Sequence, residues 1–155
     1  MAAIRPKQDA IDLILQFMYA IDTNDRTLLE SSLHADVVYD QSGLEKVTGM
    51  PMPPIKGLRA TADLLMGSVG RMDATHHVTN FRVQTLSPDD ALEIKCYSIS
   101  YHYRLGEAIV PDKEGFIAGN EYTSEVVKDD SGQWKLRKFA IRVLWCKGDL
   151  SVFGS

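Results

Sequence analysis

The hydrophobic pattern of this chain changes its period once, near residue 75. Before that point apolar residues recur at helical spacing, and after it they alternate with polar residues in long runs. Helices followed by long strands favour an α+β fold, in which three N-terminal helices pack on one face of a curved, mostly antiparallel sheet. The expected helices are 7–23, 26–33 and 57–70, and the expected long strands are 75–86, 91–104, 116–128 and 133–146.

The connections carry turn and loop signals. A short β-prone segment, 37–39, ends at the turn residues 40–43, and the prolines of the stretch 50–54 exclude a regular helix or central strand there. A turn is also predicted at 88–90 and a longer loop at 106–115. The stretch 50–54 and the loop 106–115 are candidates for lids over a site, or for covers of a sheet edge.

Composition narrows the class of protein. The chain has 155 residues, 45% hydrophobic and 25% charged, as is typical of one globular domain spanning 1–155. A net charge of −4 without a basic stripe argues against nucleic acid or an anionic membrane as partner. No secretory start and no apolar run of membrane-spanning length are present, so a cytoplasmic protein is expected. Cys96 and Cys146, which lack CxxC spacing, are expected to be buried free thiols.

The adjacent pair His76-His77 lies in an expected strand, where neighbouring side chains point to opposite faces of the sheet. His77 shares a face with Phe81 and Val83, and imidazole titrates near neutral pH, so we take His77 as the best general acid or base. A buried structural histidine is the alternative. His102, on the next strand, is a second proton carrier or a hydrogen-bond donor to a substrate oxygen, and an ordinary sheet histidine otherwise.

Four stretches carry a resemblance to a known family. Residues 19–28 place Asp22 just after the first long helix, 74–78 and 100–104 are histidine-bearing strands, and 131–145 contain a last hairpin and strand. Over nearly its whole length the chain resembles the cone-shaped fold of nuclear transport factor 2. Within that fold it resembles the SnoaL-like enzymes and the fungal scytalone dehydratases. The resemblance implies acid–base catalysis without cofactor or metal.

The chain also departs from the family. The scytalone dehydratases use two tyrosines to hold a water near the substrate carbonyl, and those places fall on Ile21 and Gln41 here. The family's pocket asparagine falls near Thr123, with Asn120 as the alternative. The catalytic set implied by the resemblance is therefore His77, Asp22 and His102, without the residues for water-mediated carbonyl activation.

Other residues are candidates with plain structural alternatives. Asp22 would orient an imidazole as carboxylates do in triads, or would cap the next helix. Aromatic walls suit a planar substrate, although core packing is the alternative for each of them and a turn for Asp40. The candidate substrate-binding residues are Tyr39, Asp40, Trp145, Tyr122, Phe116, Phe17, Met52 and Asn120.

Taken together, these features predict a cofactor-independent lyase or isomerase. It would act on a small polyketide- or terpenoid-like ring substrate by dehydration, double-bond shift or cyclisation. Non-catalytic small-molecule binding and protein interaction are the alternatives from other classes, and a metal triad of His77, His102 and Asp22 is a minor one. The long strands alternate on both faces, which predicts a homodimer or homotrimer.

Overall fold

A computed structural model gives the fold and describes residues 4–87 and 91–154. The predicted turn at 88–90 lies outside the described residues. The helices are α1 (Ile4–Asp22), α2 (Arg26–Ser32), α3 (Glu45–Thr48) and α4 (Leu58–Gly67), with 3-10 turns η1 (Val69–Arg71) and η2 (Leu150–Phe153). The strands are β1 (Leu33–Gly43), β2 (Ile55–Lys56), β3 (Asp73–Ser87), β4 (Ala91–Tyr103), β5 (Phe116–Lys128) and β6 (Trp134–Gly148).

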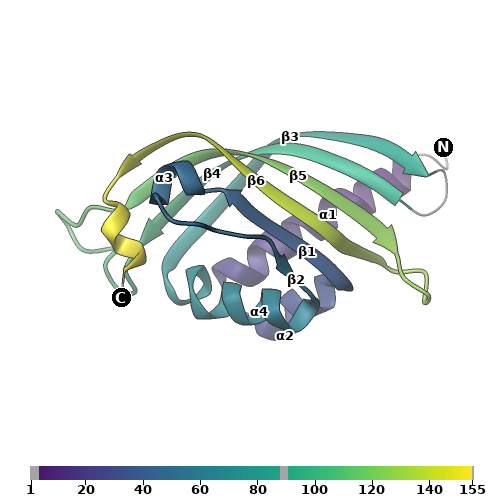
Figure 1. Cartoon of the computed structure of the whole chain (residues 1–155), viewed down its shortest axis with the longest axis horizontal. Helices are drawn as coiled ribbons and strands as arrows, with labels where there is room; N and C mark the ends of the chain where they lie inside the picture. The colour runs from purple at the N-terminus through teal and green to yellow at the C-terminus, as the bar shows by residue number, and fades with distance from the viewer. Residues whose placement is uncertain (1–3, 88–90, 155) are drawn as a thin grey trace.

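The strands form one sheet in the order β2-β1-β6-β5-β4-β3, in which only β1 and β6 run parallel. The sheet arches over α1, and α2 and α4 lie on the same side (Figure 1). The predicted α+β class with a curved, mostly antiparallel sheet is confirmed. Among the described residues, no helix is long and apolar enough to cross a membrane.

The first half holds more regular structure than its turn signals indicate. Strand β1 extends through the expected turn at 40–43, because its pairing with β6 continues as far as Gly43. A side chain at Gly43 would collide with the backbone carbonyl of Ile141, so glycine allows this close approach. The segment after it, expected to be irregular, contains α3 and β2.

The core fills the space between α1 and the concave face of the sheet. Phe17 on α1 meets Phe139 on β6 with ring centroids 5.1 Å apart, and Ile14 and Val126 beside them are fully buried. A second, small apolar cluster at the other end of the sheet contains Phe116, Ala118 and Val152. The buried polar side chains of Ser98 on β4 and Asn120 on β5 lie between the two clusters along the strands, and Ser100 and His102 lie beside the small one. The fold therefore leaves a polar zone inside an otherwise apolar concave face.

Strand β3 contains a bulge that changes which side chains face inward. Thr79 pairs with Tyr97 but Arg82 pairs with Lys95, so β3 has one extra residue there. Asn80 lies in the bulge with a left-handed φ of 59°. Asparagine is one of the few residues other than glycine that tolerates this conformation. Because of the bulge, His76 shares the inner face with Phe81, and His77 lies on the outer face.

We expect replacement of Asn80 by Val to lower the free energy of unfolding by about 1–2 kcal/mol, since a β-branched residue resists the left-handed conformation. Urea unfolding measures the difference. Asn80→Gly should unfold within about 0.5 kcal/mol of the wild type, because glycine adopts the same φ readily. Thr79→Val at the preceding exposed position is the matched control. Equal stability of the Asn80→Val and Thr79→Val variants would contradict the assignment of the bulge.

Candidate functional site

The centre of the site is a contact between the last residue of α1 and the inward histidine of β3. Asp22 Oδ1 lies 2.6 Å from His76 Nδ1, and Asp22 Oδ2 accepts the backbone N–H of His76 at 2.9 Å. The His76 side chain is only 9% exposed and that of Asp22 17%. An ionised carboxylate can only accept, so the contact places a proton on His76 Nδ1 and leaves Nε2 free as a base.

Asp22 does not serve as the cap of the next helix. Asp25 is the N-cap of α2, and its side chain accepts the backbone N–H of Leu28. Both carboxylate oxygens of Asp22 are thereby available to His76. The alternative role weighed from the sequence is wrong, and the orienting role is the one that the geometry supports.

His102 is the second imidazole of the site. Its ring meets that of His76 edge to face at a centroid distance of 5.5 Å, and its Nδ1 lies 3.3 Å from the carbonyl oxygen of Phe116. Burial, and then the nearby His76, lower the pKa of His102 to about 4. The carbonyl can only accept, so the neutral ring carries its proton on Nδ1. At neutral pH the geometry favours His102 Nε2 as an acceptor rather than the donor expected from the sequence.

The C-terminal turn η2 covers this imidazole. The ring of Phe153 lies 4.9 Å from that of His102 and 5.4 Å from that of Phe116. Arg104 fixes the turn by donating to the backbone carbonyl and the hydroxyl of Ser151 at 2.8 and 3.0 Å. An aromatic side chain from the end of the chain thus forms part of the wall beside the buried histidine.

His77 does not belong to this group. It is exposed on the outer face, where Nε2 lies 3.0 Å from Thr75 Oγ1 and the ring packs edge to face on Tyr101. The expectation that His77 shares a face with Phe81 is wrong, because the bulge at Asn80 reverses the alternation between them. The minor alternative of a metal triad that includes His77 is wrong for the same reason. In residues 4–87 and 91–154, no group of three or more His, Cys, Asp or Glu side chains is suited to hold a metal ion.

Three predicted substrate-binding residues lie at the polar zone. Tyr122 and Asn120 are buried on the inner face of β5, and Phe116 packs beside His102. Asn120 Nδ2 donates to Ser100 Oγ at 3.2 Å. Thr123, the other candidate for the family's asparagine, pairs with Lys95 in the outward-facing register. Asn120 is therefore the inward amide.

The remaining predicted residues lie elsewhere. Phe17 is part of the main core, and Tyr39 stacks on Phe139 there with centroids 5.7 Å apart.

Trp145 is 49% exposed on the outer face, where its ring lies over Gly119. Asp40 accepts the backbone N–H and hydroxyl of Ser42, and these bonds lower its carboxyl pKa. Met52 is half-buried, with its sulfur 3.5 Å from Thr48 Oγ1. Trp145 and Asp40 are thus corrected as site residues.

Sequence reasoning missed His76, Ser98 and Phe153. One signal for His76 was available: an asparagine inside a long alternating strand, since asparagine is enriched in left-handed conformations. For Ser98 the available signal was its place on the same strand face as His102, but this signal is weak because small hydroxyl side chains are common in strands. Nothing in the sequence pattern pointed to Phe153.

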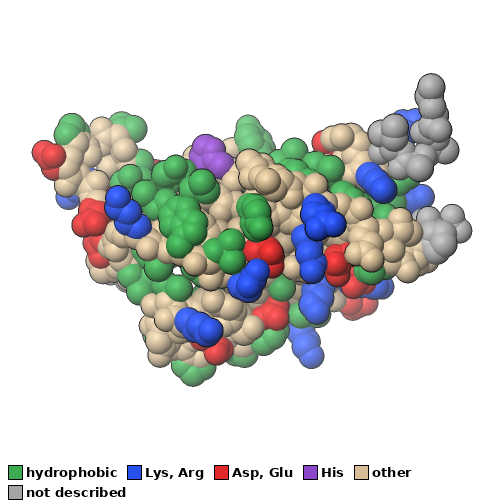
Figure 2. Space-filling view, turned by 90° about the horizontal axis from the view of Figure 1, so that it is seen from above, with side chains coloured by type: hydrophobic (Ala, Val, Ile, Leu, Met, Phe, Trp, Pro, Cys, Tyr) green, Lys and Arg blue, Asp and Glu red, His purple; other side chains and the backbone are tan. Residues whose placement is uncertain are grey.

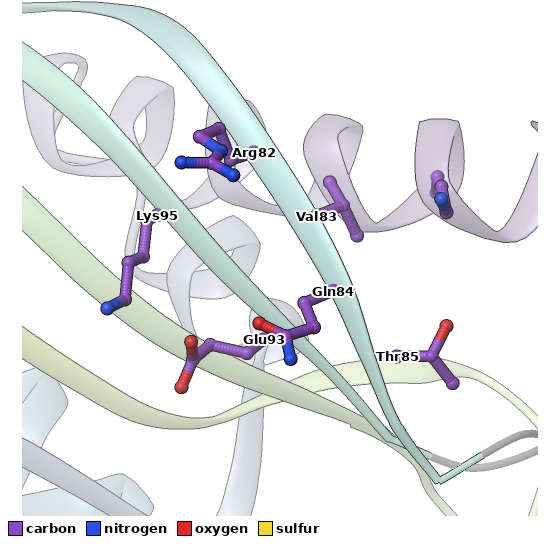
Figure 3. Close-up of a pocket in the computed structure, with 7 residues that line it drawn as sticks. Arg82, Val83, Gln84, Thr85, Glu93 and Lys95 are labelled. Atoms are coloured by element: carbon purple, nitrogen blue, oxygen red, sulfur yellow. The ribbon is translucent and has the colours of Figure 1, made fainter.

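A surface hollow is separate from the acid–base group. Figure 3 shows it along the far end of the β3–β4 hairpin, where Arg82, Glu93 and Lys95 extend from the two strands. Lys7 of α1 completes its charged lining. Its lining includes neither His76 nor His102, so this hollow is not part of the acid–base group.

Comparisons with known proteins agree with this architecture. Residues 4–140 match the SnoaL-like domain. Terrestric acid biosynthesis cluster protein E of Penicillium crustosum is 32% identical over 149 residues, covering 95% of this chain and 89% of the relative. A candidate scytalone dehydratase from Novosphingobium aromaticivorans superposes with a TM-score of 0.75 at 19% identity, over 94% of this chain and 88% of its own. The hexachlorocyclohexane dehydrochlorinase LinA-type3 of Novosphingobium barchaimii gives 0.76 at 20%, over 99% and 96%.

The environment of His102 predicts a pH dependence of stability. The ordinary histidine pKa is 6.5 and the folded value is about 4, so between these pH values the unfolded chain binds more protons. Stability should therefore fall as the pH drops from 6.5 towards 4, by an amount on the order of 2–3 kcal/mol from this residue. Urea unfolding at several pH values should show a shallower acid loss for His102→Gln than for the wild type. His77→Gln, which removes an exposed histidine, should keep the wild-type slope, and a His102→Gln slope that also stays unchanged would contradict the account.

Proposed function

Because the chain belongs to the SnoaL-like domain family, we propose that it is a cofactor-independent lyase or isomerase that acts on a small oxygenated ring compound. The observation that carries the proposal is the Asp22–His76 contact with a second, neutral imidazole beside it. The relative from the terrestric acid biosynthesis cluster supports a biosynthetic, polyketide-related substrate. His76 takes the role expected for His77.

The first chemical step is removal of a proton from a carbon next to a ring carbonyl. His76 Nε2 takes the proton, and the electron pair of the broken C–H bond forms the C=C bond of an enolate. Asp22 stabilises the imidazolium that results, since its carboxylate is already hydrogen-bonded to Nδ1. His102 is less suited to gain the proton, because its burial and its neighbour His76 disfavour the charged ring.

The second step returns the proton. Delivery from His76 to a leaving β-hydroxyl gives water and an unsaturated ketone. In a β,γ-unsaturated ketone, delivery to the γ-carbon instead gives the conjugated double-bond isomer. His102 Nε2 accepts a hydrogen bond from a substrate hydroxyl and thereby orients the ring. Which product forms depends on whether a hydroxyl or a carbon lies nearest to the imidazolium.

The proposal is tested by proton exchange, because exchange reports the first step whichever product is formed. Ring ketones with a β-hydroxyl, scytalone included, are incubated with the protein in D₂O, and deuterium uptake at the α-carbon and loss of water are followed by NMR and mass spectrometry. We expect His76→Ala to lower the enzymatic rate about 10²–10⁴-fold, as removal of a general base does. Asp22→Asn should lower it about tenfold or more, because the amide does not stabilise the imidazolium.

His77→Ala is the matched control, since it removes the neighbouring histidine from the outer face. It should keep the wild-type rate. Equal activity of the His76→Ala and His77→Ala variants, with both folded by circular dichroism, would reject the assignment of His76. No acceleration of exchange by the wild type on any ring ketone of the panel would reject the lyase or isomerase proposal and favour non-catalytic binding.

We also propose that the protein self-associates through the outer face of the sheet. Figure 2 looks onto this face and shows hydrophobic side chains gathered over one part of it. Tyr97, Ile99 and Tyr101 of β4 are 48%, 40% and 37% exposed, and Trp145 of β6 lies in the same row as Ile99 across Gly119. A contiguous apolar face of this kind is typical of an interface between subunits.

Ile99→Glu should convert a homodimer or homotrimer into a monomer, because it places a charge in the middle of this face. Sedimentation velocity measures the mass of the species in solution. Ile109→Glu, a change of the same kind in an exposed loop, should leave the assembly intact. A wild-type protein that sediments as a monomer would contradict the proposal directly.

A further inference from the structure

Beside the two imidazoles lies a group of hydroxyl and amide side chains that the acid–base step does not use. Ser98 and Ser100 on β4 and Asn120 and Tyr122 on β5 all face inward, and none is more than 4% exposed. Apolar residues are the rule at such positions, because burying a polar group without a partner costs free energy. Four neighbouring exceptions on one face call for a chemical reason.

Their hydrogen bonds are only partly satisfied. Asn120 Nδ2 donates to Ser100 Oγ, and Ser100 Oγ donates to the carbonyl of Ala118 at 3.4 Å. Ser98 Oγ is sealed from solvent and has no hydrogen-bond partner among the described residues. The Tyr122 hydroxyl lies close to Ser98 and Asn120, without a hydrogen bond of ordinary geometry to Ser98. Two hydroxyls thus lie near each other without a hydrogen bond of ordinary geometry between them.

The strand register places the Ser98 position about one ring's width from His76. Ser100 is directly opposite His76, and Ser98 is the next inward residue along β4. Diagonal neighbours of this kind lie about 7–8 Å apart, the span of a substituted six-membered ring. Ser98 is in turn opposite Asn120, and Tyr122 is close enough to Asp22 for the carboxylate charge to raise its pKa further.

We propose that the hydroxyls of Tyr122 and Ser98 together hold the carbonyl oxygen of the substrate, and stabilise it as the enolate forms. The inference rests on the proposed function and gives the substrate an orientation: its carbonyl lies over β4 and β5, and the carbon that loses the proton lies at β3. Burial is the main cause that raises the pKa of Tyr122, to about 12, so the phenol keeps its proton and donates at neutral pH. Paired donors aimed at a developing oxyanion are a strong source of catalysis in a water-excluded site.

The positions that hold the carbonyl-activating water in the resembling dehydratases do not offer these donors. Ile21 is buried in the main core, and Gln41 turns its amide to the carbonyl of Pro53 at 3.4 Å. In this chain, hydroxyls from the sheet would therefore bind the substrate carbonyl in place of that water. The step involves no transfer from Tyr122 or Ser98, since the proton moves from carbon to His76 while the two hydroxyls only donate hydrogen bonds.

The test uses Tyr122→Phe and Ser98→Ala, with Ser124→Ala as matched control. Ser124 Oγ is also buried and unpaired on the inner face, but it lies opposite Phe139 in the main core, away from His76. The first readout is binding of 4-nitrophenol, whose absorbance reports the phenolate. We expect the wild type to bind the phenolate and to lower the apparent pKa of the bound phenol. Tyr122→Phe and Ser98→Ala should each weaken binding about ten- to hundredfold, as loss of a hydrogen bond to a charged group does.

The second readout is the exchange rate of the ring ketones, which should fall mainly in kcat, by about 10²–10³-fold for either variant. Ser124→Ala should match the wild type in both assays. If the Tyr122→Phe and Ser98→Ala variants turn over ring ketones as fast as the Ser124→Ala variant, the inference is overturned and the proposed function stands. If the wild type binds the phenolate tightly, both variants lose this binding, and the wild type turns over no ketone, the oxyanion site is supported and the proposed function is overturned instead.

Discussion

The carboxylate of Asp22 is the constraint on which the inner face depends. β3 is an edge strand, so the backbone N–H groups on its free edge have no neighbouring strand to bond to. Asp22 accepts one of them, that of His76, and binds the imidazole of the same residue with its other oxygen. One side chain therefore joins the end of α1 to the sheet edge and fixes the tautomer of the His76 imidazole. The helix that fills the core thus also carries the carboxylate that orients His76.

The two histidines illustrate how surroundings divide roles between identical side chains. His76 Nδ1 faces the carboxylate of Asp22, whereas His102 faces a backbone carbonyl and lies deeper, where burial lowers its pKa. The ring–ring contact adds to the difference, since a proton on His76 opposes a second one on His102. The two rings therefore suit the proposed cycle of proton removal and return, in which His76 carries the proton and His102 stays neutral.

Periodicity was enough to predict the fold and not enough to predict the site. A change from helical to alternating spacing is recognisable even when a strand contains a small irregularity. The predicted bounds of the helices and long strands are therefore close to the observed ones. Which face a side chain occupies depends on every residue between it and a reference position, and one bulge reverses it. The extra residue at Asn80 exchanged His76 for His77, and the register shift beside Val143 placed Trp145 outside. Strand β5 pairs with β4 without a shift, and there alternation correctly distinguishes Asn120 from Thr123.

The polar zone is placed where the fold can tolerate it. The main core binds α1 to one end of the sheet, and the small cluster around Phe116 and Val152 closes the other end. The buried apolar residues gather in these two clusters, so the strand positions between and beside them can carry hydroxyls, an amide and imidazoles. In the proposed complex, the substrate carbonyl supplies the acceptor that the Ser98 hydroxyl lacks in the free protein. The unsatisfied hydrogen bonds of the free protein are then the interactions that recognise the ligand.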